Sequence, residues 1–197
     1  MLALVHSTCF SQDSSKYSLA VSTGRVLFGT GDVVGYGINV EGLKRINKIS
    51  RPGLHQLHIG VELLFEQGQS KIRVKNPTDQ EFITEVFHHV SNTALWIKVK
   101  YHPLGWFVAG FHIDVGAVAG YTLQSRQSQA IRLNVANTSY KATLLRFTSG
   151  VVIGYRVGLG WDLPISRRIS VGPRADFENF TNGDINTLAG LKLVIRF

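Results

Sequence analysis

Two residues near the middle of the chain, His89 and Ser91, carry side chains that could cooperate in nucleophilic catalysis. A histidine can take the proton of a nearby serine hydroxyl, and the activated serine can then act as a nucleophile. Such a pair also needs an acid that orients the histidine, and Glu85 and Glu66 are the candidates nearby. Because so short a motif carries little information, the sequence favours a solvated junction over a catalytic site here.

A second set of ionisable side chains shares one property. Each lies in a stretch where bulky apolar residues alternate with small or polar ones, at a position of the small or polar kind. The set consists of Glu41, Glu62, Lys98, Lys100, Asp114, Arg156, Arg174, Asp176, Lys192 and Arg196. Charges confined together are costly unless they are paired, so we expect a network of ion pairs. Its function would be either a gated ion path or a polar plug.

The stretch 147–163, FTSGVVIGYRVGLGWDL, shows most clearly how such groups are positioned. Its odd positions are nearly all bulky and apolar, whereas its even positions are mostly glycine, with Arg156 and Asp162 among them. Successive side chains of a β-strand point to opposite faces, so one face is apolar and the other small or charged. A soluble sheet places its large apolar residues inside and its polar ones in water. Lipid outside and a narrow polar interior satisfy both faces, which predicts a strand of a transmembrane β-barrel.

The same alternation recurs along the chain and predicts eight strands in total. They cover residues 16–28, 33–46, 54–66, 93–101, 106–121, 147–163, 169–179 and 187–197. The predicted fold is all-β, an eight-stranded antiparallel up-and-down transmembrane β-barrel with a polar interior. Side chains fill a barrel of this size, which favours the polar plug over an ion path. Segments 67–92 and 122–146 are too polar to cross a membrane and are expected to be long extracellular loops.

Bulk properties exclude several other classes. No segment offers the roughly 20 apolar residues that a membrane helix requires. The net charge is +8, but the basic residues are spread along the chain without a nucleic-acid-binding motif, so a nucleic-acid partner is not expected. Cys9 is the single cysteine and the seven histidines are scattered, so we expect neither a disulfide nor a metal site, and no cofactor. Residues 1–15 are expected to be the remnant of a signal peptide or a flexible N-terminus, preceding one barrel domain over 16–197.

The segment 122–146 contains four cations and no acid. These cations are Arg126, Arg132, Lys141 and Arg146. They could bind a polyanion such as the phosphates of lipopolysaccharide, whereas the simpler interpretation is an ordinary solvated basic loop.

Two parts of the sequence resemble a known family. Residues 95–121, LWIKVKYHPLGWFVAGFHIDVGAVAGY, and the end of the chain, ISVGPRADFENF followed by LAGLKLVIRF, resemble OmpX/PorT-like outer-membrane β-barrel proteins common in Bacteroidetes. The resemblance implies integral location in a bacterial outer membrane and contact with its lipid and lipopolysaccharide, and we expect a monomer. It also implies that Phe197, the terminal aromatic, is the signal for the barrel assembly machinery.

The sequence HVSN at 89–92 also resembles a His-x-Ser-Asn motif of outer-membrane lipid A deacylases. Strand parity would place His89 and Ser91 on the lipid face near the outer rim, where such an enzyme needs them. In that family, however, the motif lies near the end of the chain, and its flanking residues do not match here. The sequence therefore predicts a structural or surface-binding barrel rather than an enzyme or a solute pore, with lipid A or phospholipid ester hydrolysis as the alternative.

Overall fold

A computed structural model describes residues 16–29, 33–46, 56–76, 79–103, 110–135 and 138–197, and it describes side chains in these ranges except over 72–86 and 126–145. Its strands are β1 (Tyr17–Phe28), β2 (Val33–Arg45), β3 (Gln56–Asn76), β4 (Asp79–His102), β5 (Phe111–Val135), β6 (Thr138–Trp161), β7 (Leu163–Pro164), β8 (Ile169–Phe180) and β9 (Ile185–Arg196). Within the described ranges, no helix is long and apolar enough to span a membrane.

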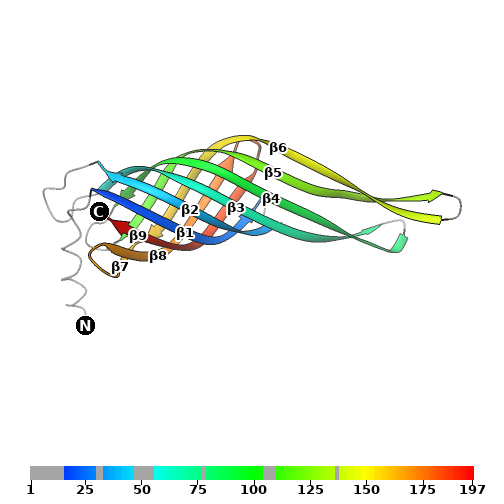
Figure 1. The fold of residues 1–197 in the computed structure, drawn as a ribbon, viewed down its shortest axis with the longest axis horizontal. Helices are drawn as coiled ribbons and strands as arrows, with labels where there is room; N and C mark the ends of the chain where they lie inside the picture. The colour runs from blue at the N-terminus through cyan, green and yellow to red at the C-terminus, as the bar shows by residue number, and fades with distance from the viewer. Residues whose placement is uncertain (1–15, 30–32, 47–55, 77–78, 104–109, 136–137) are drawn as a thin grey trace.

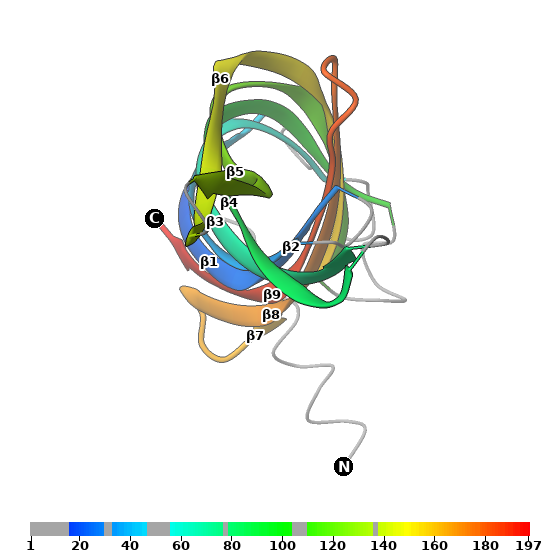
Figure 2. The ribbon, with the colours of Figure 1, turned by 90° about the vertical axis from the view of Figure 1, so that its right-hand side faces the viewer.

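The strands form one closed antiparallel sheet. Strands β1 to β6 pair in chain order, and β7 and β9 both pair with β8. β1 pairs with β9 and β6 pairs with β8, which closes the ring seen end-on in Figure 2. The two-residue strand β7 continues β6 past Asp162 and pairs with β8 in the same register. The wall therefore has eight strands, which confirms the predicted up-and-down barrel. Phe197 lies at the seam, where its backbone N–H donates to the Tyr17 carbonyl at 2.9 Å.

Burial alternates along the strands in the way that the sequence predicted. In β6, Val151 and Ile153 expose 77% and 57% of their surface, whereas Val152 and Arg156 are buried. Large apolar side chains are exposed around the wall, among them Tyr17, Leu19, Val40, Ile59, Leu63, Ile97, Val115, Leu159, Leu191 and Leu193. A continuous exposed apolar belt with a charged interior is the pattern of a barrel that sits in lipid.

Four strands are about twice as long as the others, and here the sequence-based prediction of loops is wrong. β3, β4, β5 and β6 contain 21, 24, 25 and 24 residues, against 12 or 13 in β1, β2, β8 and β9. Most of segments 67–92 and 122–146 belongs to two β-hairpins, β3–β4 and β5–β6, which project from one end of the barrel in Figure 1. The ladder continues because backbone hydrogen bonds do not require an apolar face.

The position of the two hairpins orients the barrel. A tilted strand of about 9–11 residues is enough to cross the bilayer, so the hairpins extend far beyond it. Bacterial barrels carry their longer connections outside the cell, which assigns the hairpin end to the extracellular side. The C-terminus lies at the opposite, periplasmic end (Figure 1). Residues 1–15, the predicted signal remnant or flexible N-terminus, lie outside the described residues.

Candidate functional sites inside the barrel and at its mouth

A network of buried charges fills the middle of the barrel. Its centre is Lys98 on β4, whose ammonium contacts three carboxylates from three other strands: Glu41 on β2, Glu62 on β3 and Asp114 on β5. Glu41 and Glu62 lie directly opposite each other in the β2–β3 ladder, an arrangement that is repulsive without a cation between them. Lys98 supplies that cation, and Lys100 adds a 2.7 Å contact to Glu41.

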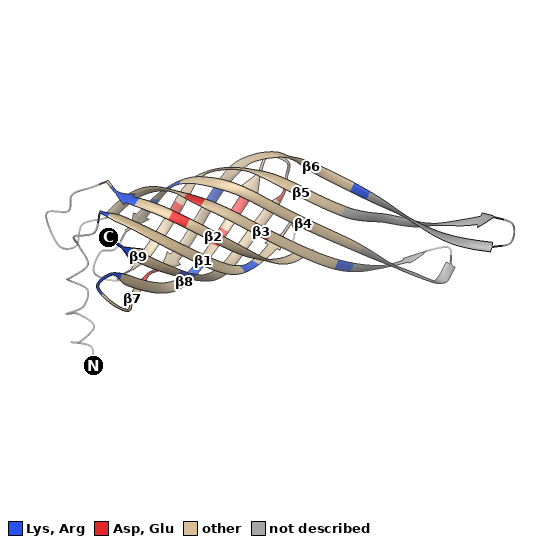
Figure 3. Ribbon diagram, in the orientation of Figure 1, with Lys and Arg blue, Asp and Glu red and all other residues tan. Residues whose placement is uncertain are grey.

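Two arginines extend this network to the other side of the barrel. Arg156 on β6 lies 2.8 Å from Asp176 and 2.6 Å from Glu178. Arg174 on β8 lies 2.8 Å from Glu62 and 2.6 Å from Asp176. We call this set the central ion network; its members are Glu41, Glu62, Lys98, Lys100, Asp114, Arg156, Arg174, Asp176 and Glu178, and all of them are buried. Figure 3 shows acidic and basic positions interleaved around the middle of the wall.

Trp96 is the aromatic centre of the network and was missing from the sequence-based site. It is fully buried, and its ring centroid lies 4.3 Å from Lys98 Nζ, 4.7 Å from Arg156 Cζ and 5.6 Å from Arg174 Cζ. Cations near the face of an indole ring are attracted by its quadrupole. The ring has room because residue 116 is glycine: a Cβ there would lie 2.7 Å from Trp96 Nε1. Trp96 lies between the outward-facing residues Leu95 and Ile97, so the alternation of the strand could have predicted that it points inward.

A second polar layer lies nearer the periplasmic end. Lys192 Nζ is 3.1 Å from Asp162 and 2.9 Å from His112 Nε2. The rings of His58, His102 and His112 follow one another, with centroids 5.3 and 5.5 Å apart. In the part of the chain that the structure describes, no group of three or more His, Cys, Asp or Glu residues is arranged to hold a metal ion.

The predicted set of ionisable residues is thus distributed over both layers. All of its members except Lys192 and Arg196 belong to the central ion network, and Lys192 belongs to the periplasmic layer. Arg196 is half-buried and forms no ion pair with another described residue. Sequence reasoning left out Glu178 and Asp162, although both alternate inward with the residues that it included.

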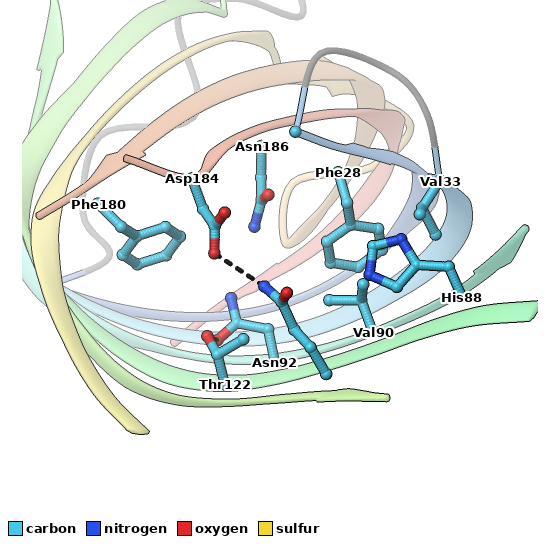
Figure 4. A pocket seen from close by; sticks show the side chains of 11 residues that line it. Phe28, Val33, His88, Val90, Asn92, Thr122, Phe180, Asp184 and Asn186 are labelled. Atoms are coloured by element: carbon cyan, nitrogen blue, oxygen red, sulfur yellow. Dashed lines mark hydrogen bonds between the residues drawn. The ribbon is translucent and has the colours of Figure 1, made fainter. Parts of the chain in front are cut away.

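A cavity of about 240 Å³ opens above the network at the extracellular end of the lumen. Strands β1, β2, β8 and β9 contribute their ends or the adjoining turns, and β4 and β5 contribute residues farther along their length. Its wall combines aromatic, aliphatic and polar side chains (Figure 4), and we call it the mouth cavity; its lining is Phe28, Gly29, Val33, His88, Val90, Asn92, Thr122, Gln124, Phe180, Asp184 and Asn186.

His89 and Ser91 lie on β4 and point away from this cavity. Both are half-buried, and they alternate with the buried residues Val90 and Asn92, which line the cavity. No hydrogen bond joins His89 to Ser91 in the described structure. The suggested acid Glu66 is buried inside the barrel, on the other side of the wall, and accepts a hydrogen bond from Asn92 at 3.2 Å. Glu66 therefore cannot orient His89, and the side chain of Glu85 lies outside the described part.

The four cations of segment 122–146 lie on the β5–β6 hairpin rather than in a loop. The register places Arg126 opposite Arg146 and Arg132 opposite Lys141. Arg146 is exposed, and the side chains of the other three are outside the described set.

Comparison with known proteins supports the fold. No protein-family model matches the chain, and no curated protein matches it in sequence. The chain is similar to the crystal structure of Ail, the attachment invasion locus protein of Yersinia pestis, with a TM-score of 0.52 and 10% identity over 93% of this chain and 99% of that chain. It also matches the outer membrane protein OprG from Pseudomonas aeruginosa, with a TM-score of 0.48 and 10% identity over 94% of this chain and 99% of that chain.

At this level of identity the similarity to Ail establishes the fold and not the activity. Membership of the PorT-like family in particular stays a prediction. The closed barrel, its exposed apolar belt and its charged interior agree with that fold. The chain is an integral protein of a bacterial outer membrane, built as a small eight-stranded barrel.

Proposed function

We propose that the protein is a surface-binding or structural barrel that acts through its two extracellular hairpins, and that it is neither a solute pore nor an enzyme. The observation that carries this proposal is the length of β3–β6, which continue for about ten residues beyond the neighbouring strands. At about 3.3 Å per residue, this extension is on the order of 30 Å along the strand. The hairpins thus offer a binding surface outside the bilayer.

The occupied interior supports the exclusion of a pore. An eight-stranded barrel is only wide enough for its own side chains, and here Trp96, Arg156 and Lys98 are fully buried in the middle of the lumen. We expect no steady ion conductance when the folded protein is inserted into a planar bilayer. Stepwise single-channel currents of uniform size would contradict this part of the proposal.

The ligand that best fits the β5–β6 hairpin is a surface polyanion, with the phosphates of lipopolysaccharide as the nearest source. Cations directly opposite each other in a ladder repel, and the pairs Arg126–Arg146 and Arg132–Lys141 are both of this kind. An anion placed over such a pair relieves the repulsion. Arginine is also well suited to phosphate because its guanidinium can donate two parallel hydrogen bonds.

The test is a measurement of lipopolysaccharide binding by folded protein in lipid discs over a range of salt concentrations. We expect affinity to fall as salt rises, because exposed charges are screened beyond about 10 Å at 0.1 M salt. The variant Arg126→Gln/Arg132→Gln should bind several-fold more weakly. The matched control is Arg167→Gln/Arg168→Gln, which removes the same charge from the exposed turn before β8 at the other end. Equal losses in the two variants would show that only net charge matters and would refute a hairpin site.

Contact with the barrel assembly machinery through Phe197 and a monomeric state complete the proposal. The seam supports a role for the terminal residue, since Phe197 pairs through its backbone with Tyr17 and exposes 68% of its surface. Deletion of Phe197 should slow assembly in cells more than folding of purified protein into detergent. Sedimentation in detergent should give the mass of one chain.

A further inference from the structure

The mouth cavity plays no part in the proposed function and has the features of a binding site. Two aromatic rings, Phe28 and Phe180, stand on opposite sides of it in Figure 4. Between them lie polar side chains of Asn92, Thr122 and Asn186, all of them buried to more than nine-tenths. Apolar walls with a few fixed polar groups are typical of small-molecule sites.

The hydrogen bonds inside the cavity direct amide donors at carboxylates and leave several acceptors open to a ligand. Asn92 Nδ2 donates to Glu66 at 3.2 Å, and Asn186 Nδ2 donates to Glu178 at 3.4 Å. Gln124 Nε2 donates to the Asp184 carboxylate at 3.0 Å, the contact drawn in Figure 4. The amide nitrogens are therefore directed at carboxylates. Acceptor capacity remains on the amide oxygens of Asn186 and Gln124 and on the carboxylate of Asp184.

Two carboxyl groups lie at or directly behind the cavity. Asp184 lines the cavity itself, and Glu66 lies directly behind Asn92 and Asn186, each of which donates to it. Glu66 forms no ion pair with another described residue, and its buried Oε1 atom has no hydrogen-bond partner. A carboxyl group buried without an ion-pair partner is costly to ionise, so a cation bound above it would favour its charged form.

We propose that the mouth cavity binds a small organic ammonium ion. The charged nitrogen donates hydrogen bonds to the Asp184 carboxylate and to the amide oxygens of Asn186 and Gln124. The apolar part of the ligand contacts Phe28 and Phe180, whose ring faces also attract a cation. At about 30 Å³ for each water molecule, the cavity holds roughly eight waters, which fits a ligand with about as many heavy atoms.

A matched pair of probes tests the role of the charge, namely phenethylammonium and its neutral analogue 2-phenylethanol. Folded, isotope-labelled protein is titrated with each probe in detergent micelles. The readout is the side-chain amide NMR signals of Asn186 and Gln124, which report the site directly, and each affinity is calculated from the free probe concentration after its partition into detergent has been measured. We expect saturable shifts with the ammonium and an affinity about tenfold weaker for the alcohol, because a hydrogen bond to a charged group contributes about 1.5–3 kcal/mol.

Two variants and one control complete the experiment. Asp184→Asn removes the carboxylate of the cavity wall, and Glu66→Gln removes the charge behind it with little change in shape. Each should weaken ammonium binding several-fold, and Glu66→Gln keeps the test valid if Asp184→Asn disturbs its turn. Asp79→Asn removes the same charge at the tip of the β3–β4 hairpin and should leave binding unchanged. Equal binding of both probes, or no saturable shift with either, would overturn the proposal.

Discussion

Replacement of Lys98 by methionine should destabilise the barrel strongly. Methionine keeps an unbranched side chain of similar length and removes the charge that separates Glu41 from Glu62. These two carboxylates face each other across the β2–β3 ladder, and both are completely buried. Removal of one partner from a buried ion pair costs about 3–5 kcal/mol, because the remaining charge is neither solvated nor paired. We expect a loss in this range, since Arg174 and Lys100 still contact the two glutamates.

The assay is equilibrium unfolding in urea of protein refolded into lipid vesicles, followed by tryptophan fluorescence and by the shift of the folded band on unheated gels. With a denaturant slope of about 2 kcal/mol/M, a loss of about 4 kcal/mol lowers the urea midpoint by roughly 2 M. Lys44→Met is the matched control, because Lys44 is exposed at the end of β2 and an exposed charge contributes little. The control should keep its midpoint within about 0.3 M of the wild type, from the same slope.

A double-mutant cycle with Asp114→Asn separates the pairing from general damage. Asp114 lies 3.0 Å from Lys98 and 4.0 Å from Lys100. In the double variant Lys98→Met/Asp114→Asn one opposite charge is removed with the lysine, so the combined loss should be smaller than the sum of the single losses by about 1–3 kcal/mol. If Lys98→Met unfolds at the wild-type urea concentration, or if the two losses simply add, the central ion network does not stabilise the barrel by charge pairing.

Three further predictions concern packing and closure. Gly160→Ala should cost about 1–3 kcal/mol in the same urea assay, because its Cβ would lie 2.5 Å from a buried histidine ring, whereas Gly42→Ala, with nothing within 4 Å of its Cβ, should cost much less. Trp96→Ala should cost about 3–5 kcal/mol, as expected for loss of a large buried aromatic. The variant should lose only the fluorescence that Trp96 itself emits. Phe197→Ala should leave the urea midpoint nearly unchanged, because the backbone bond to Tyr17 does not depend on the side chain; a large shift would mean that the ring itself holds the seam.

The fold was predictable from the sequence because lipid imposes a strict period of two. Where a strand crosses the membrane, outward positions are apolar as a rule, and the stretch 147–163 shows this at every odd position except Ser149. Beyond the bilayer both faces of a hairpin meet water, so the alternation disappears while the ladder continues. This explains why 67–92 and 122–146 were predicted as loops although most of their residues lie in strands. Backbone hydrogen bonding leaves no such pattern in polar sequence.

The sequence predicted which charged side chains point into the barrel, but it did not predict which of them form ion pairs with each other. Parity placed Lys98 and Glu41 inside, but only the register of the closed sheet brings them together across 57 positions of sequence. The mouth cavity was beyond sequence reasoning for the same reason, since Phe28, Asn92 and Asn186 come from three strands far apart in the chain. The candidate catalytic acid Glu66 shows the opposite case, in which residues near each other along the sheet face different sides of it. Glu66 is close to His89 in register, yet its parity places it on the other side of the wall.

Charge inside the barrel also has a consequence for folding specificity. A slip of one residue in strand pairing would turn every side chain of a strand to the opposite face. For β4 this would move Lys98 and Lys100 into lipid, at a cost of about 2–4 kcal/mol for each lysine near the middle of the bilayer. It would also leave Glu41 and Glu62 facing each other without a cation. An apolar interior would impose no such penalty, because both faces would then tolerate lipid. The buried charges therefore specify the register of the barrel even where their net contribution to stability is modest.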